Sequence, residues 1–364
     1  MGNLTPLFAW ADIVRRSQGE VLRAFGYGPE ECSYRVLASG AGWRLRHYDG
    51  PAAGPALLIV AAPIKRPYIW DLTPSVSTVR TCLDRGIRTF LLEWTRPSPG
   101  EGIAHLADYA DSAIGDAVAQ VSQETGGAKP FLIGHSLGGT LAAIYGALQP
   151  DSLQGLVLLS APLCFRPDTG RFRDAIVSLA PSSLSEFETV SGSLLSQLSA
   201  VADPQTFVWS RLMDRVSSIG NPRASDLQAR IEHWALDEVA LPGALVDELL
   251  NWLYREDRFT RGSLSIQDRM VGPSDLDLPA LAVVNAADDI VPMASVLPFL
   301  KATRGNDISV LTYDGETGVG LQHLGILLGR NAHAQIWPEI LAWINDRHRE
   351  LEPVASSHRG LDRA

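Results

Sequence analysis

The strongest structural signal in this chain is the run Phe131-Leu132-Ile133-Gly134-His135-Ser136-Leu137-Gly138-Gly139-Thr140. Three apolar residues able to form a buried strand lead into the pattern Gly-x-Ser-x-Gly, and a mostly apolar run over residues 141–148 has the character of a buried helix. A turn joining such a strand to such a helix is too tight for side chains at its flanks, which explains Gly134 and Gly138. We therefore predict a nucleophile elbow that presents the Ser136 hydroxyl at the positive end of the following helix.

Apolar runs on both sides of this stretch predict a sheet around it. The predicted strands are residues 44–48 at an edge, followed by 55–61, 88–94, 131–133, 155–159, 280–285 and 308–313. Predicted helices, among them 73–85 and 103–124, separate them. Strands that alternate with helices at this spacing indicate a doubly wound, mostly parallel sheet. Together with the elbow, this pattern predicts an α/β-hydrolase fold.

The alternation stops between residues 165 and 275. This region is rich in Ser, Leu and Trp, shows helical periodicity and contains no convincing strand. We predict a hydrolase core formed by residues 1–164 and 276–350, a helical cap formed by residues 165–275, and a disordered tail over residues 351–364. Caps of this kind shape substrate pockets and exclude water, so we expect the cap to cover the nucleophile. Trp234 is predicted to line the acyl pocket, with packing inside the cap as the alternative.

Composition narrows the class of protein. The 364-residue chain has a formal net charge of −10, which argues against a nucleic-acid partner because no basic surplus neutralises phosphates. No apolar run approaches the ~20 residues of a membrane span, and the N-terminus lacks the pattern of a signal peptide. Three cysteines without metal-ligand spacing are expected to be reduced. We expect a cytoplasmic protein that uses no cofactor and no metal ion.

A serine becomes a good nucleophile when a base takes its proton and a third group orients that base. In this fold the order along the chain is nucleophile, acid, base, and the acid and base follow late strands. Asp288 follows the predicted strand 280–285, and His323 follows the predicted strand 308–313. Ser136, Asp288 and His323 are therefore the predicted catalytic triad.

Neighbouring residues fit the same roles less well. Asp289 is the competing acid, but we expect it to cap a helix that begins near Pro292. His135 adjoins Ser136, but the elbow directs consecutive side chains apart. The other histidines precede the elbow or fall in the cap, the last helix or the tail.

An oxyanion hole needs two backbone N–H groups that point at the reacting carbonyl oxygen. In this fold one comes from the residue after the nucleophile, here Leu137, and the other from the loop after the strand 55–61. Pro63 has no N–H to donate. We therefore predict Ile64 as the second donor, with Lys65 as the alternative.

Several further motifs follow one another in order over residues 55–345. They are the segments 68–72 (Tyr-Ile-Trp-Asp-Leu), 90–94 (Phe-Leu-Leu-Glu-Trp), 134–140, 234–243, 251–258 and 288–292 (Asp-Asp-Ile-Val-Pro). The chain thereby resembles the polyhydroxyalkanoate synthase family, particularly its shorter members. That family's nucleophile box reads Gly-x-Cys-x-Gly-Gly-Thr, and its acid motif usually reads Asp-His-Ile-Val-Pro. The resemblance implies that Asp288 is the acid and His323 the base.

The nucleophile departs from this family pattern, because Ser136 stands where the synthases have cysteine. A cysteine takes an acyl group from coenzyme A as another thioester and so keeps it activated for transfer to a chain-end hydroxyl. A serine converts the thioester into an ordinary ester, whereas its attack on an existing ester is nearly isoenergetic and release to water is downhill. The nucleophile therefore points toward hydrolysis.

Three functional hypotheses follow. The first is a serine esterase that cleaves hydroxyacyl esters, with a small-molecule, oligomeric or polymeric substrate. The second is a synthase-like acyltransferase that uses hydroxyacyl-coenzyme A, and the third is a non-catalytic binding protein at the surface of a storage granule. The intact triad argues against the third. A second copy of the chain in a homodimer, or a granule surface, stays open as a partner.

Overall fold

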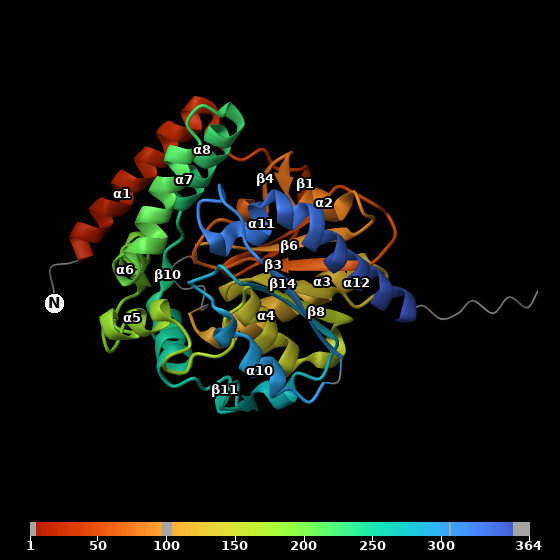
Figure 1. Cartoon of the computed structure of the whole chain (residues 1–364). Coiled ribbons are helices and arrows are strands. Elements are labelled where there is room, and N and C mark those ends of the chain that lie inside the picture. The colour runs from red at the N-terminus through yellow and green to blue at the C-terminus, as the bar shows by residue number, and fades with distance from the viewer. Residues whose placement is uncertain (1–4, 97–103, 306, 352–364) are drawn as a thin grey trace, which may run out of the picture.

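An eight-stranded sheet forms the centre of the computed structural model, which describes residues 5–96, 104–305 and 307–351 (Figure 1). Its order is β1-β2-β6-β3-β7-β8-β13-β14. Neighbouring strands run parallel from β6 to β14, while β1 and β2 are antiparallel at one edge. The strands are β1 (Tyr34–Gly40), β2 (Trp43–Tyr48), β3 (Ala56–Val60), β6 (Arg88–Trp94), β7 (Phe131–His135), β8 (Gly155–Leu159), β13 (Ala280–Asn285) and β14 (Ile308–Tyr313).

Both faces of this sheet are buried, which explains the continuous apolar runs of its central strands. In β3, Leu58 and Val60 belong to the hydrophobic cluster on one face, and Leu57 and Ile59 belong to the cluster on the other. Helices α3 (Ile114–Glu124) and α4 (Leu137–Leu148) contribute to the first cluster, and α2 (Thr78–Leu83), α11 (Gly325–Leu328) and α12 (Trp337–Leu351) to the second. The predicted doubly wound, mostly parallel sheet is confirmed.

The region predicted as a cap contains five α-helices and four short strands within the described residues. The helices are α5 (Arg171–Leu179), α6 (Gly192–Ala202), α7 (Arg211–Ser217), α8 (Pro222–Leu236) and α9 (Gly243–Glu248). The strands form two pairs, β9 (Thr189–Val190) with β10 (Leu241–Pro242) and β11 (Leu264–Ile266) with β12 (Arg269–Val271). The region is thus mostly helical, and its strands of two or three residues leave no periodic signal in the sequence.

Two elements pack across the predicted boundary between core and cap. Helix α1 (Thr5–Leu22), at the start of the predicted core, lies along α8 and also packs on α6 of the cap (Figure 1). Conversely, β12 packs on α4 of the core. The predicted tail falls outside the described residues from position 352 onward.

Several smaller features complete the fold. The short strands β4 (Asp71–Thr73) and β5 (Val76–Ser77) pair beside the sheet, and α10 (Leu297–Lys301) follows β13. All three cysteines are free thiols, as expected. Among the described residues, no helix combines the length and the apolar character that crossing a membrane would take.

Candidate active site

Ser136 sits in a strained turn between β7 and α4. Its φ of 54° and ψ of −132° put it on the left-handed side that residues other than glycine seldom adopt. Its N–H donates to the Leu159 carbonyl at 3.0 Å, and its own carbonyl accepts from Gly139 N at 2.9 Å and Thr140 N at 3.1 Å. The backbone of β8 and the first turn of α4 thus hold the serine in this conformation. The predicted elbow geometry is present.

The flanking glycines are required by close contacts. A Cβ on Gly134 would lie 2.5 Å from the Gly139 nitrogen, and one on Gly138 would lie 2.3 Å from the Val60 carbonyl oxygen. Any other residue at either position would force the backbone apart. The contact of Gly138 with Val60 also places the start of α4 directly against the end of β3, where the loop that contains Ile64 begins.

The predicted acid and base form a buried hydrogen-bonded pair. The Nδ1–H of His323 donates to Asp288 Oδ2 at 2.7 Å, and the two side chains are 9% and 0% exposed. Asp288 Oδ1 accepts from the N–H groups of Ile290 and Val291 at 2.9 and 3.1 Å. Burial alone would raise the pKa of Asp288, but the charge and hydrogen bond of His323 and these two amides lower it below its usual value. Asp288 is therefore an ionised acceptor.

The other ring nitrogen of His323 is left without a hydrogen-bond partner in the described part of the chain. Because Nδ1 carries the proton shared with Asp288, Nε2 of the neutral ring has a free lone pair. Nε2 is buried and has no hydrogen-bond partner among the described residues. A serine triad requires this arrangement of its histidine, with the acid fixing the tautomer and the second nitrogen free to take a proton.

His135 supports the base, which the sequence did not reveal. Its Nε2–H donates to the His323 carbonyl oxygen at 2.8 Å, and the two rings lie 4.5 Å apart. Burial and the nearby His323 ring lower the pKa of His135 to about 3, so it stays neutral at neutral pH. The residue before Ser136 therefore contacts the predicted base, and His323 lies beside the elbow.

Asn285 ties the acid loop to the base loop and was also missed. Its Nδ2 donates to the Gln322 carbonyl at 2.7 Å, and its Oδ1 accepts from Ala287 N at 3.0 Å. The one available signal was a polar residue at the carboxyl end of an otherwise apolar strand. Such a residue can join two loops only when the second loop, 37 positions later, folds back onto the strand end.

The expected role of Asp289 as a helix cap is wrong. The short helical turn Met293–Ser295 begins after Pro292 and has no side-chain cap. The amides of Ile290 and Val291 bond to Asp288 instead, and Asp289 is exposed. Asp288 is therefore the carboxylate that both faces the base and organises the loop.

The oxyanion and pocket residues stay predictions. The carbonyl of Ile64 accepts from Val239 N at 3.1 Å, which attaches the predicted oxyanion loop to the segment after α8. Trp234 is 8% exposed, and its Nε1–H donates to the Arg66 carbonyl at 2.8 Å. The tryptophan thus contacts the same loop as Ile64. Its predicted contact with an acyl group, like the oxyanion role of Leu137 and Ile64, rests on the sequence.

Comparison with known proteins agrees with this fold. Residues 77–315 match the alpha/beta hydrolase fold family. The chain belongs to the α/β-hydrolase family. Among solved structures, a monoacylglycerol lipase from Paleococcus ferrophilus superposes with a TM-score of 0.53 at 17% identity, covering 84% of this chain and 99% of the lipase. Esterase RhEst1 from Rhodococcus sp. ECU1013 gives 0.51 at 17%, covering 86% and 98%. Likeness at this identity concerns the fold.

Sequence relatives of this α/β-hydrolase carry a more specific name. Proteins named poly(3-hydroxyalkanoate) polymerase subunit PhaC from Haloferax mediterranei and Allochromatium vinosum are 28% and 25% identical over 311 and 312 residues. The matches cover 84% and 83% of this chain, 62% of the first relative and 85% of the second. The resemblance to the polyhydroxyalkanoate synthase family is confirmed.

Proposed function

We propose that this α/β-hydrolase transfers hydroxyacyl groups through an ester formed on Ser136. The main observation behind this proposal is the buried hydrogen-bonded pair of Asp288 and His323. His323 also contacts His135, the residue immediately before Ser136. The Asp288–His323 pair leaves His323 Nε2 without a hydrogen-bond partner among the described residues and free to act as a base toward Ser136, which is strained and partly exposed. The similarity to named polymerases over more than four-fifths of the chain supports hydroxyacyl compounds as the donor class.

Acylation then proceeds by steps that the side chains can each perform. Ser136 Oγ bonds to the acyl carbonyl carbon while His323 Nε2 takes the hydroxyl proton. Asp288 stabilises the resulting imidazolium through Nδ1–H. The N–H groups of Leu137 and Ile64 are the proposed donors to the oxyanion. When the bond from carbon to the thiol or alcohol leaving group breaks, that group takes the proton from His323.

The acyl acceptor we put first is the hydroxyl end of a hydroxyalkanoate chain. The names of the relatives favour this acceptor. Transfer from the seryl ester to a hydroxyl replaces one ester by another. It needs no further activation once a thioester has acylated the serine. For these reasons we rank a polymerase-like acyltransferase first. An esterase, which Ser136 considered alone would favour, ranks second.

Hydrolysis is the second candidate, because the chain carries Ser136 where the synthase motif has cysteine. Water can release the seryl ester in a downhill step. The two candidates share the acyl-enzyme and differ only in the molecule that attacks it.

The test supplies purified wild-type protein and the Ser136→Ala variant with a hydroxyacyl-coenzyme A thioester and, separately, with a hydroxyalkanoate oligomer. Polymer formation with release of coenzyme A, lost in Ser136→Ala, is the expected result. Free acid without polymer would assign the enzyme to the hydrolases. No turnover of either donor and no labelling of Ser136 by a fluorophosphonate would overturn both candidates.

A further inference from the structure

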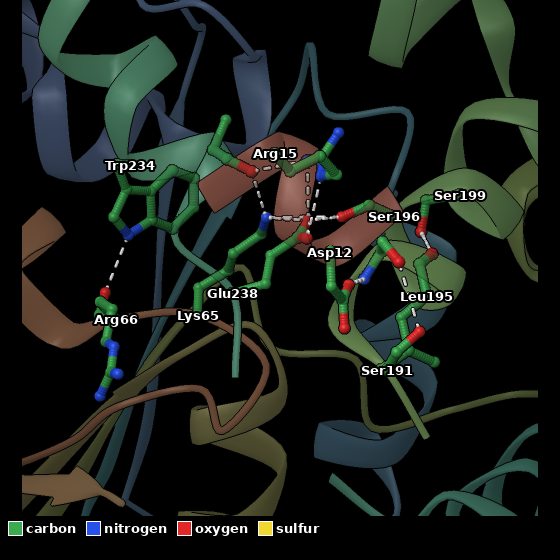
Figure 2. Close-up of polar contacts among 12 residues, drawn as sticks. Asp12, Arg15, Lys65, Arg66, Ser191, Leu195, Ser196, Ser199, Trp234 and Glu238 are labelled. Atoms are coloured by element: carbon green, nitrogen blue, oxygen red, sulfur yellow. Dashed lines mark hydrogen bonds and ion pairs between the residues drawn. The ribbon is translucent and has the colours of Figure 1, made fainter. Parts of the chain in front are cut away.

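Three charged side chains from distant parts of the chain meet beside the predicted oxyanion loop (Figure 2). Arg15 comes from α1, Lys65 from the loop after β3, and Glu238 from the segment after α8. Arg15 donates to both carboxylate oxygens of Glu238, with Nε–Oε2 at 3.1 Å and Nη2–Oε1 at 2.9 Å. Lys65 Nζ donates to Oε1 at 2.7 Å, and the Ser196 hydroxyl of α6 donates to the same oxygen.

The carboxylate at the centre of this cluster is buried, and the two cations around it are partly buried. The Glu238 side chain is 5% exposed, that of Lys65 is 20% exposed and that of Arg15 is 26% exposed. Burial lowers the pKa of the Lys65 ammonium to about 8, although Glu238 opposes the shift; the charges of Arg15 and Arg211 add to it. A buried charge that loses a partner keeps its desolvation cost. The geometry of the cluster therefore depends on all of its members.

Backbone contacts carry the cluster to the oxyanion loop. Lys65 and Glu238 form an antiparallel β-bridge, and Val239 N donates to the Ile64 carbonyl at 3.1 Å. Lys65 Nζ and Arg15 Nη2 both donate to the Ala235 carbonyl, at 2.7 and 3.0 Å. Ile64, the predicted second oxyanion donor, is thus followed directly by Lys65. Lys65 is bonded to Glu238 and Ala235, and Arg15 of α1 bonds to the same two residues.

We propose that Arg15, Lys65 and Glu238 are positioning residues that set the place of the oxyanion loop. Through them the N-terminal helix α1 contributes to catalysis without contacting the substrate. The inference rests on the proposed acyl transfer through Ser136, because an oxyanion hole matters only for that chemistry. A misplacement of about 1 Å in an active site can cost about 100-fold in rate, so small movements of this loop suffice.

The decisive variant is Arg15→Gln, with Arg16→Gln as its control. Arg16 is the next residue of α1, is exposed, and loses the same charge when substituted. Turnover is measured per active site titrated with a fluorophosphonate, using whichever ester or thioester the wild type consumes. Arg15→Gln is expected to lower kcat about 10-fold with KM unchanged, and to weaken binding of a boronic acid transition-state analogue by the same factor. Arg16→Gln leaves all three values unchanged.

Two further variants separate positioning from general stability. Arg15→Lys keeps the charge and is expected to restore part of kcat. In Arg15→Gln combined with Lys65→Met, the losses are expected to be less than multiplicative, because both act through Glu238. A lower melting temperature with unchanged kcat and boronate affinity in Arg15→Gln would overturn the inference, even if Lys65→Met fails to fold. Wild-type protein that neither labels nor turns over would overturn the proposed function, and the inference with it.

Discussion

Two loops border the proposed oxyanion hole, and the molecule holds them in different ways. The elbow at Ser136 is held by its own backbone and by close contacts that only Gly134 and Gly138 permit. The loop at residues 64–66 is held by side chains from outside the sheet, among them Glu238 and Trp234. Substitutions at the elbow should therefore act severely and locally. The second loop should respond to changes far away in the sequence.

Asp288→Asn tests the hydrogen-bonded pair that lies next to the elbow, and it should have the largest effect. Loss of the ionised acceptor leaves His323 in the wrong tautomer, and a fall in kcat of about 10⁴-fold is expected. The matched control is Asp289→Asn, which changes an exposed carboxylate one residue later and should alter kcat only a few-fold. Comparable losses in two folded variants would move the catalytic acid away from Asp288.

Gly138→Ala tests whether close packing holds the elbow. The new Cβ would lie 2.3 Å from the Val60 carbonyl, so α4 and the end of β3 must separate. We expect kcat to fall about 100-fold and stability by about 1–3 kcal/mol. Gly146→Ala is the control, because its Cβ in the same helix would meet only leucine side chains, the nearest at 3.3 Å. Wild-type kinetics in Gly138→Ala would refute the local account.

Trp234→Ala tests the second loop from the cap. It removes the hydrogen bond to the Arg66 carbonyl and a largely buried indole, which should cost about 3–5 kcal/mol of stability. The rates on a short and a long acyl ester are compared, with Trp209→Ala as the control because Trp209 is 57% exposed. A selective loss on the long ester is expected if Trp234 lines the acyl pocket. An unchanged ratio would remove that assignment and leave its contact with the loop.

His135→Gln should have the smallest effect and one confined to acid pH. The pKa of His135 is about 3 in the fold, below its ordinary value, so between about pH 6.5 and about pH 3 the unfolded chain takes up this proton and the folded chain does not. Wild-type stability should therefore fall as pH drops, by about 2 kcal/mol at pH 5 from this residue alone. Glutamine can still donate to His323. Urea unfolding at pH 7 and pH 5 should show a smaller loss for the variant, and equal losses would contradict this account.

Much of the geometry of the candidate site could be predicted because its signals are local. Ser136 lies between a strand and a helix that the hydrophobic pattern reveals, and its neighbouring glycines mark the tight turn. Asp288 and His323 each follow a strand, and parallel strands bring their carboxyl ends to one edge of the sheet. The observed strands β6, β8, β13 and β14 have the predicted bounds. By contrast, β1 escaped prediction because it is a half-exposed edge strand with a bulge.

The sequence by itself therefore determined the fold class, the elbow and the placement of Asp288 and His323 after late strands, since each depends on periodicity or on turn chemistry within a short window. Only the tertiary structure decided what holds these groups in place. His135 and His323 are 188 positions apart, and Arg15 and Glu238 are 223 apart. No local pattern records such pairs, because their members come from separate elements that only the packing of the whole chain brings into contact.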